Sequence, residues 1–374
     1  MDIQIQLDRK PPIYTNEDVI SGRVILRSEA QMDIATITIN LSGTATSRLD
    51  LGKLTESHKL FQRNEQIFPP RTCAGWFTSA AVTLSSGEHS FPFSIMFPQV
   101  AECYKSSTAD AARNQLGSRQ PHHLLRNLPP SSGNKYTPEE IRYTLEASVV
   151  QQGLIRRTHK ATRDVSFHPV STIRQPLHSL KISKTVNLST IASELLCPPL
   201  TYEVEVELQN GPFLLLGHPI ALGVKIMHMN GEKNAISLQD FQTMLRETTE
   251  IRARGSIQGF TRSWVVQTMT NLRQPLVAAN RPTVGSVLEL DDRLWSRHCV
   301  PVHLAPTFET CNLIRRYKLE IRLGIEFGRN YTRILEFEFP AYVLLPSFTR
   351  FTQSCVGSLE PILDRWERHV PKKE

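Results

Sequence analysis

The sequence lacks the cysteine and apolar patterns that mark several protein classes. Its six cysteines are scattered and form no C-x-x-C pair, so neither a cysteine metal site nor a disulfide framework is expected. The longest apolar stretches, such as Phe213–Leu216, are far below the roughly 18 residues of a membrane-spanning helix. The start alternates apolar and polar residues, unlike a signal peptide. We therefore expect a cytoplasmic chain with reduced thiols and no transmembrane segment.

Motifs for catalysis are also missing. The sequence contains no G-x-S-x-G, no phosphate-binding G-x-x-x-x-G-K-[ST], no G-x-G-x-x-G after a strand and no H-E-x-x-H. The histidines are dispersed, and the pair His122–His123 has no nearby carboxylate or thiol to complete a metal set. We expect no enzymatic activity, no cofactor and no metal site.

The charge balance is only mildly basic. A net charge of +7 over 374 residues comes without a basic stripe interleaved with aromatics, which argues against nucleic acid as a partner. It suits a solvated surface, and it also permits contact with acidic headgroups or phosphorylated tails during peripheral membrane association.

What dominates the chain is period-two alternation of apolar and polar residues. Successive side chains of a strand point to opposite faces, so each such run predicts a strand with one face on a core. The runs recur in both halves and are separated by Gly, Pro, Ser and Asn: 3–7, 37–41, 141–149, 202–208 and 317–325. The pattern predicts an all-β chain of two consecutive antiparallel β-sandwiches.

Composition sets the expected boundaries. A polar, turn-rich stretch at 99–134 is predicted to be an insertion within a first domain of residues 1–170. A second domain is expected over 171–348, followed by a tail at 349–374. Residues 237–245 begin with a loose helix-capping pattern, but the all-β context favours a strand there. In the tail, Trp366 completes an i, i+3, i+4, i+7 apolar pattern, which predicts a short amphipathic helix. That helix would use Trp366 as an anchor, either on the body of the protein or on a membrane or partner.

Several stretches, taken in order, resemble the arrestin family. Ile3–Leu7 followed by Pro12–Val24 is similar to the first two strands of an arrestin N-domain, in which a tight turn precedes a V-x-S-G-x-V strand. Gly22 is expected where the chain turns tightly. Gly87–Phe93 resembles a G-E-h-x-F-P-F strand, with Gly87 at its turn and its two phenylalanines on one sheet face. Further matches are Pro129–Ser131, Ile141–Ala147, and Pro306–Leu319 with the fungal pattern P-S-F-x-T-x-N-I-x-R-x-Y-x-L.

The resemblance spans residues 1–346 and implies the arrestin fold of two immunoglobulin-like sandwiches. It also implies a non-enzymatic adaptor that links the cytoplasmic tails of membrane receptors or transporters to ubiquitination and endocytosis. Recruitment from the cytoplasm to plasma membrane or endosomes would follow. An alternative within the same fold is a stable subunit of a trafficking coat, similar to a retromer subunit.

One short motif bears on the ubiquitination link. Pro11, Pro12 and Tyr14 form a PPxY, the pattern that docks in the aromatic groove of WW domains, and in the α-arrestin family it recruits HECT-type ubiquitin ligases. Here it falls between the first two expected strands, so Pro12 and Tyr14 also suit a structural role. Arg9 and Lys10 beside it are candidates for contact with a phosphate, or simply solvated loop charges.

Overall fold

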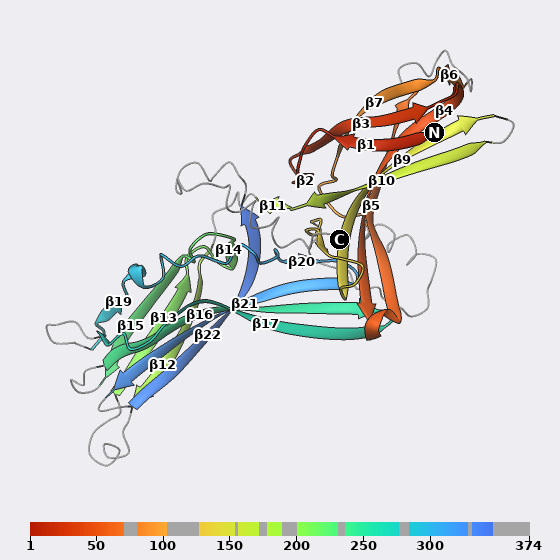
Figure 1. The fold of residues 1–374 in the computed structure, drawn as a ribbon. Helices are drawn as coiled ribbons and strands as arrows, with labels where there is room; N and C mark the ends of the chain where they lie inside the picture. Colours follow the sequence, from red (N-terminus) through yellow and green to blue (C-terminus); the bar gives the residue numbers. More distant parts are fainter. Residues whose placement is uncertain are drawn as a thin grey trace. The chain divides into compact units, whose positions relative to one another are not determined.

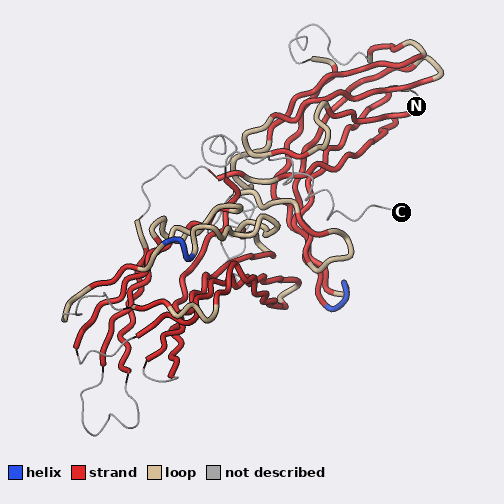
Figure 2. Tube along the Cα trace, turned by 60° about the vertical axis from the view of Figure 1, so that its left-hand side comes forward, coloured by secondary structure: helices blue, strands red, loops and turns tan. Residues whose placement is uncertain are grey.

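The computed structural model describes residues 1–70, 81–102, 127–153, 156–171, 178–188, 200–230, 236–276, 284–327 and 331–346. Nearly all regular structure in them is strand (Figure 2), and the helical content is limited to two three-residue turns, η1 (Asp50–Gly52) and η3 (Asp292–Leu294). The prediction of an all-β chain with two sandwiches is confirmed. The tail that holds Trp366 and residues 103–126 of the expected insertion lie outside the described residues.

The chain forms two compact units. Unit 1 contains Met1–Val170 together with Thr249–Gly259 and Phe308–Arg315, and unit 2 contains Ser171–Thr248, Phe260–Thr307 and Arg316–Glu374. Two segments from the second half of the sequence therefore belong to unit 1, which a single boundary near residue 171 does not anticipate.

Unit 1 has two sheets (Figure 1). The smaller one has the order β1 (Asp2–Leu7), β3 (Val19–Ser28), β7 (Gly87–Met96). The larger one has the order β2 (Ile13–Tyr14), β10 (Arg157–Phe167), β9 (Glu139–Gln152), β4 (Met32–Leu49), β5 (Leu54–Phe68). Two short strands add to it, β6 (Val82–Leu84) on β4 and β8 (Ser132–Gly133) on β9.

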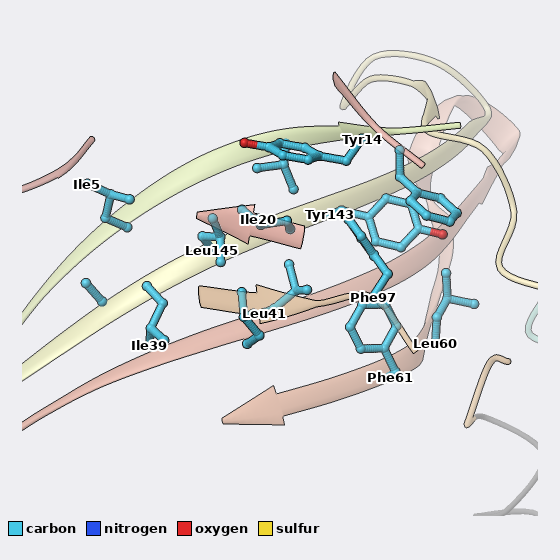
Figure 3. Close-up of a cluster of buried hydrophobic side chains, with 14 of the residues drawn as sticks. Ile5, Tyr14, Ile20, Ile39, Leu41, Leu60, Phe61, Phe97, Tyr143 and Leu145 are labelled. Atoms are coloured by element: carbon cyan, nitrogen blue, oxygen red, sulfur yellow. The ribbon is translucent and has the colours of Figure 1, made fainter. Parts of the chain in front are cut away.

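The core of unit 1 follows from the alternation in β4 and β9. From Ile37 to Leu49 in β4 and from Ile141 to Val149 in β9, every second residue is buried, and Ile39, Leu41 and Leu145 are among them (Figure 3). Each such side chain contributes about 1.5–3 kcal/mol through removal of apolar surface from water. At one end the core becomes aromatic: the ring centroid of Phe97 lies 5.4 Å from that of Tyr143, whose hydroxyl donates to Pro129 O at 2.6 Å.

Gly22 does not lie at a turn, so that expectation was wrong. It sits within β3, opposite Leu7 of β1 and Phe93 of β7. A Cβ at this position would stand 2.3 Å from Gln6 O, so the residue is glycine because the backbones approach closely. Gly87, by contrast, begins β7 with a φ of +128°, a conformation that favours glycine. Phe91 and Phe93 both pack on the core, as predicted.

Unit 2 is the second sandwich. One sheet has the order β12 (Leu180–Leu188), β13 (Leu200–Leu208), β15 (Leu222–Asn230), β19 (Val287–Glu289). The other includes β22 (Tyr331–Pro346), β21 (Leu313–Phe327), β16 (Ile236–Ala253) and β17 (Ser256–Met269), in that order. Shorter strands that pair in this sheet are β11 (Val170–Ser171), β14 (Phe213–Leu215), β18 (Gln274–Pro275) and β20 (Phe308–Glu309), of which β20 belongs to unit 1.

Two details refine the expected topology. Residues 237–245 lie within β16, which confirms the preference for a strand over a helix there. The pairing is not purely antiparallel, because β2 runs parallel to β10 and β14 runs parallel to β22. Both parallel partners are only two or three residues long and fasten a connecting segment onto the end of a long strand.

Candidate functional site

The PPxY segment is part of the sheet of unit 1. Ile13 and Tyr14 form β2, where Pro12 O accepts a hydrogen bond from Ser166 N and Tyr14 O accepts one from His168 N, both at 2.9 Å. The Tyr14 side chain is 1% exposed, and burial raises the pKa of its hydroxyl. Among the described residues this hydroxyl has no hydrogen-bond partner. Pro11 is exposed and Pro12 half-buried.

Arg9 closes the turn around this strand. Its guanidinium donates to Ile13 O at 2.9 Å and to Asp18 Oδ1 at 2.8 Å, and it lies 5.0 Å from the centre of the Tyr14 ring. The hydrogen bond from Arg9 holds the pKa of Asp18 below its ordinary value, with further help from Thr15 N–H and hydroxyl. Lys10 is exposed. A phosphate at Arg9 would therefore compete with Asp18, whereas Lys10 carries no such constraint.

The structure brings together a second group of polar residues that the sequence had not marked as a site. Asn312 is 1% exposed, and its side-chain amide donates to Ala45 O at 3.1 Å and to Ser47 Oγ at 3.0 Å. Its backbone carbonyl accepts from Arg252 N at 2.8 Å. The Thr310 hydroxyl accepts from Leu313 N at 3.0 Å and closes the turn that presents Asn312. One asparagine thus joins β4 to both late segments of unit 1.

Arg315 makes a charged contact in the same unit. Its side chain is 8% exposed and pairs with Glu139 at the start of β9, while Nε donates to Thr249 Oγ1 at 3.3 Å. The guanidinium also lies 5.3 Å from the centre of the Phe308 ring. Glu140, the next residue of β9, pairs with Arg48 of β4. Adjacent carboxylates therefore hold two arginines from distant parts of the sequence.

These residues explain the motif Pro306–Leu319 physically. Phe308, Thr310, Asn312 and Arg315 are the positions at which the quoted pattern has F, T, N and R, and each has a contact that depends on its side chain. Sequence reasoning missed Glu139, Glu140 and Arg48, because surface strands carry such charges at many positions. We call the group Ser47, Glu139, Asn312 and Arg315 the polar clasp.

The described part of the chain also bears on metal sites and membrane spans. It contains no group of three or more His, Cys, Asp or Glu side chains placed to hold a metal ion. No helix within it is long and apolar enough to cross a membrane. Trp366 lies outside it, so the anchor role of this residue stays a prediction.

Comparison with known proteins identifies the first domain. A family model described as the N-terminal domain of arrestin (or S-antigen) matches residues 3–168, which is nearly all of the first segment of unit 1. The first domain is arrestin-like. The two sandwiches and the order of the quoted motifs agree with this assignment.

Two curated proteins that are similar to this chain are each named Arrestin-related trafficking adapter 10. The protein from Eremothecium gossypii is 23% identical over 203 residues, which cover 49% of this chain and 46% of the relative. The protein from Lachancea thermotolerans is 24% identical over 182 residues, which cover 43% of this chain and 41% of the relative. The matched part thus spans less than half the length of these relatives.

Proposed function

We propose that this arrestin-like protein is a non-enzymatic adaptor in membrane-protein trafficking, which binds cytoplasmic tails of receptors or transporters and directs them to endocytosis. The observation that carries the proposal is the arrestin N-terminal domain at residues 3–168, shared with relatives that are named trafficking adapters. The protein would act from the cytoplasm and be recruited to plasma membrane or endosomes when its client is to be removed.

The polar clasp favours the function of a rigid scaffold over that of an enzyme with moving parts. The hydrogen bonds from Asn312 to Ala45 and Ser47 are buried, and buried polar groups are costly to leave unpaired, so the late segments are held firmly in unit 1. An adaptor needs such a rigid body because ordering a surface on binding would subtract from its affinity for a short tail.

Affinity purification tests the adaptor function. The full chain, tagged and expressed at its normal level, is isolated from gently solubilised cells after nutrient and pH shifts. We expect condition-dependent recovery of a small set of integral membrane transporters or receptors. Constant recovery of one complex with fixed stoichiometry would indicate a coat subunit instead, and recovery of no membrane protein under any condition would refute the proposal.

The link to ubiquitination is proposed to use a HECT-type ligase with WW domains, which bind Pro11, Pro12 and Tyr14 only when β2 has left the sheet. Burial of Tyr14 makes this opening necessary, since a WW groove contacts the tyrosine side chain. Exposing that side chain costs about 1.5–3 kcal/mol, which reduces the apparent affinity of the folded chain roughly ten- to 150-fold.

A titration measures this penalty. Binding of a WW domain is compared between the full chain and a free peptide of residues 8–17, with Tyr14→Ala in both as the negative control. The peptide should bind at least ten times more tightly than the chain. Equal affinities would show that the segment is accessible without opening, and no binding to either would remove the motif as a docking site.

A further inference from the structure

Unit 2 contains a long strand edge that has no backbone partner among the described residues. β17 lies at the end of its sheet and pairs with β16 on its other side. The opposite sheet is protected at both edges: β19 has only three residues, and β12 is bridged by Lys184 Nζ, which donates to Glu336 O, and by Arg333, which donates to Asn187 O at 3.2 Å. Uncovered edges present unpaired N–H and C=O groups, so natural proteins normally shorten or shield them.

The edge of β17 is both open and firmly held. Thr261, Arg262 and Ser263 are exposed in succession, and Val265 is 55% exposed. On the inner side Trp264 Nε1 donates to Glu247 Oε2 at 2.9 Å, and Gln267, which is 4% exposed, donates to Leu294 O at 3.1 Å. The strand is therefore anchored to the core while its outer edge stays free to pair. Because the strand is already ordered, pairing with a partner along this edge would cost the protein little conformational entropy.

The side chains and backbone groups at the edge of β17 indicate what kind of partner would bind there. Residues 256–276, which include β17 and β18, carry Arg262 and Arg273 but no Asp or Glu. Both arginines are exposed, and neither forms an ion pair with another described residue. A row of backbone N–H and C=O groups is satisfied best by another extended backbone. The positive charge favours acidic side chains on that backbone and disfavours a second copy of this edge, which would bring its own arginines.

We propose that the free edge of β17, from Phe260 to Thr268, binds an extended acidic segment of a partner protein, which adds to the sheet as a further strand. The identity of the partner rests on the proposed adaptor function, in which the segment belongs to a client tail. The binding chemistry rests only on the edge itself. Backbone pairing would supply affinity, and Arg262 would select acidic sequences.

A peptide titration with hydrogen exchange tests the site. The probe is a fluorescein-labelled ten-residue peptide in which valine and threonine alternate with glutamate, titrated into the full chain. We expect a saturable rise in anisotropy and slower amide exchange in residues 260–268. Methylation of alternate backbone nitrogens of the peptide removes the pairing groups without changing its charge, and should weaken binding at least tenfold.

A matched pair of variants distinguishes peptide binding at the β17 edge from a general effect of added negative charge on the surface. Val265→Glu places a negative charge at the edge and should weaken binding at least tenfold. Ile334→Glu does the same at a side chain that is 62% exposed on β22, and should leave binding unchanged. Equal effects of both variants, or equal binding of the methylated peptide, would overturn the proposal.

Two other outcomes would also overturn it. If the amides of residues 260–268 that do not pair with β16 already exchange slowly in the monomer, another part of the chain covers the edge. If light scattering shows a dimer that Val265→Glu dissociates, a second copy covers it. Failure of the adaptor function is distinguishable, because the peptide would then bind at β17 while affinity purification recovers no membrane client.

Discussion

Substitution of Asn312 by alanine is expected to loosen the late segments of unit 1. The change removes both side-chain N–H donors and leaves Ala45 O, on a fully buried residue, without the hydrogen bond from Asn312. A net contribution of about 1 kcal/mol for each lost bond, with a further penalty for the unpaired carbonyl, gives a loss of about 2–4 kcal/mol. A water molecule that entered the vacated space would keep the loss near the lower value.

Hydrogen exchange with mass spectrometry suits this measurement, since two-state unfolding cannot be assumed for a chain with two units. Peptides that cover residues 308–315 should exchange about thirty to a thousand times faster in Asn312→Ala than in the wild type, if the opening free energy falls by that amount. Asn64→Ala, at an exposed asparagine of β5, is the matched control and should change nothing. Unchanged protection at 308–315 would refute the role assigned to the polar clasp.

Three further predictions concern single residues. Tyr14→Phe removes a buried hydroxyl that lacks a partner among the described residues, so the free energy of unfolding should stay constant or rise by up to about 1 kcal/mol. Tyr14→Ala should instead lower it by about 3–5 kcal/mol, and urea denaturation measures both changes. Gly22→Ala should lower the free energy of unfolding by about 1–3 kcal/mol, because its Cβ would meet Gln6 O; an unchanged melting temperature would contradict this. Burial lowers the pKa of His168 to about 4, so the folded protein favours the neutral imidazole. The free energy of unfolding should therefore fall as the pH drops from about 6.5 to about 4. His168→Gln should make this pH dependence flatter, and an equal slope in both proteins would contradict the prediction.

The strands were predictable from the sequence because their alternation is regular. Ile37, Ile39 and Leu41 are fully buried, as their spacing in β4 predicts, and the run from Tyr317 to Ile325 lies within β21. Gly22 shows the limit of this reasoning. A glycine inside a V-x-S-G-x-V pattern suits a turn and a close backbone approach equally well, and only the neighbouring strands β1 and β7 decide between them.

The polar clasp could be predicted only in part. The motif Pro306–Leu319 marked Asn312 and Arg315, but their partners Ser47 and Glu139 are more than 170 positions away in the sequence. Nothing local distinguishes Glu139 from the exposed acids of other strands. The PPxY motif was visible at once, whereas the burial of Tyr14 depends on the pairing of β2 with Ser166 and Phe167 of β10, which lie over 150 positions later.

The adaptor function is tested most directly by the surface proteome of cells that lack this protein. Membrane proteins at the cell surface are quantified before and after nutrient and pH shifts, in deleted cells and in deleted cells that again express the wild type. If the protein is an adaptor, a small set of transporters or receptors stays at the surface in the deleted cells and is cleared again after re-expression. A surface proteome that responds identically in both strains under all conditions would contradict it.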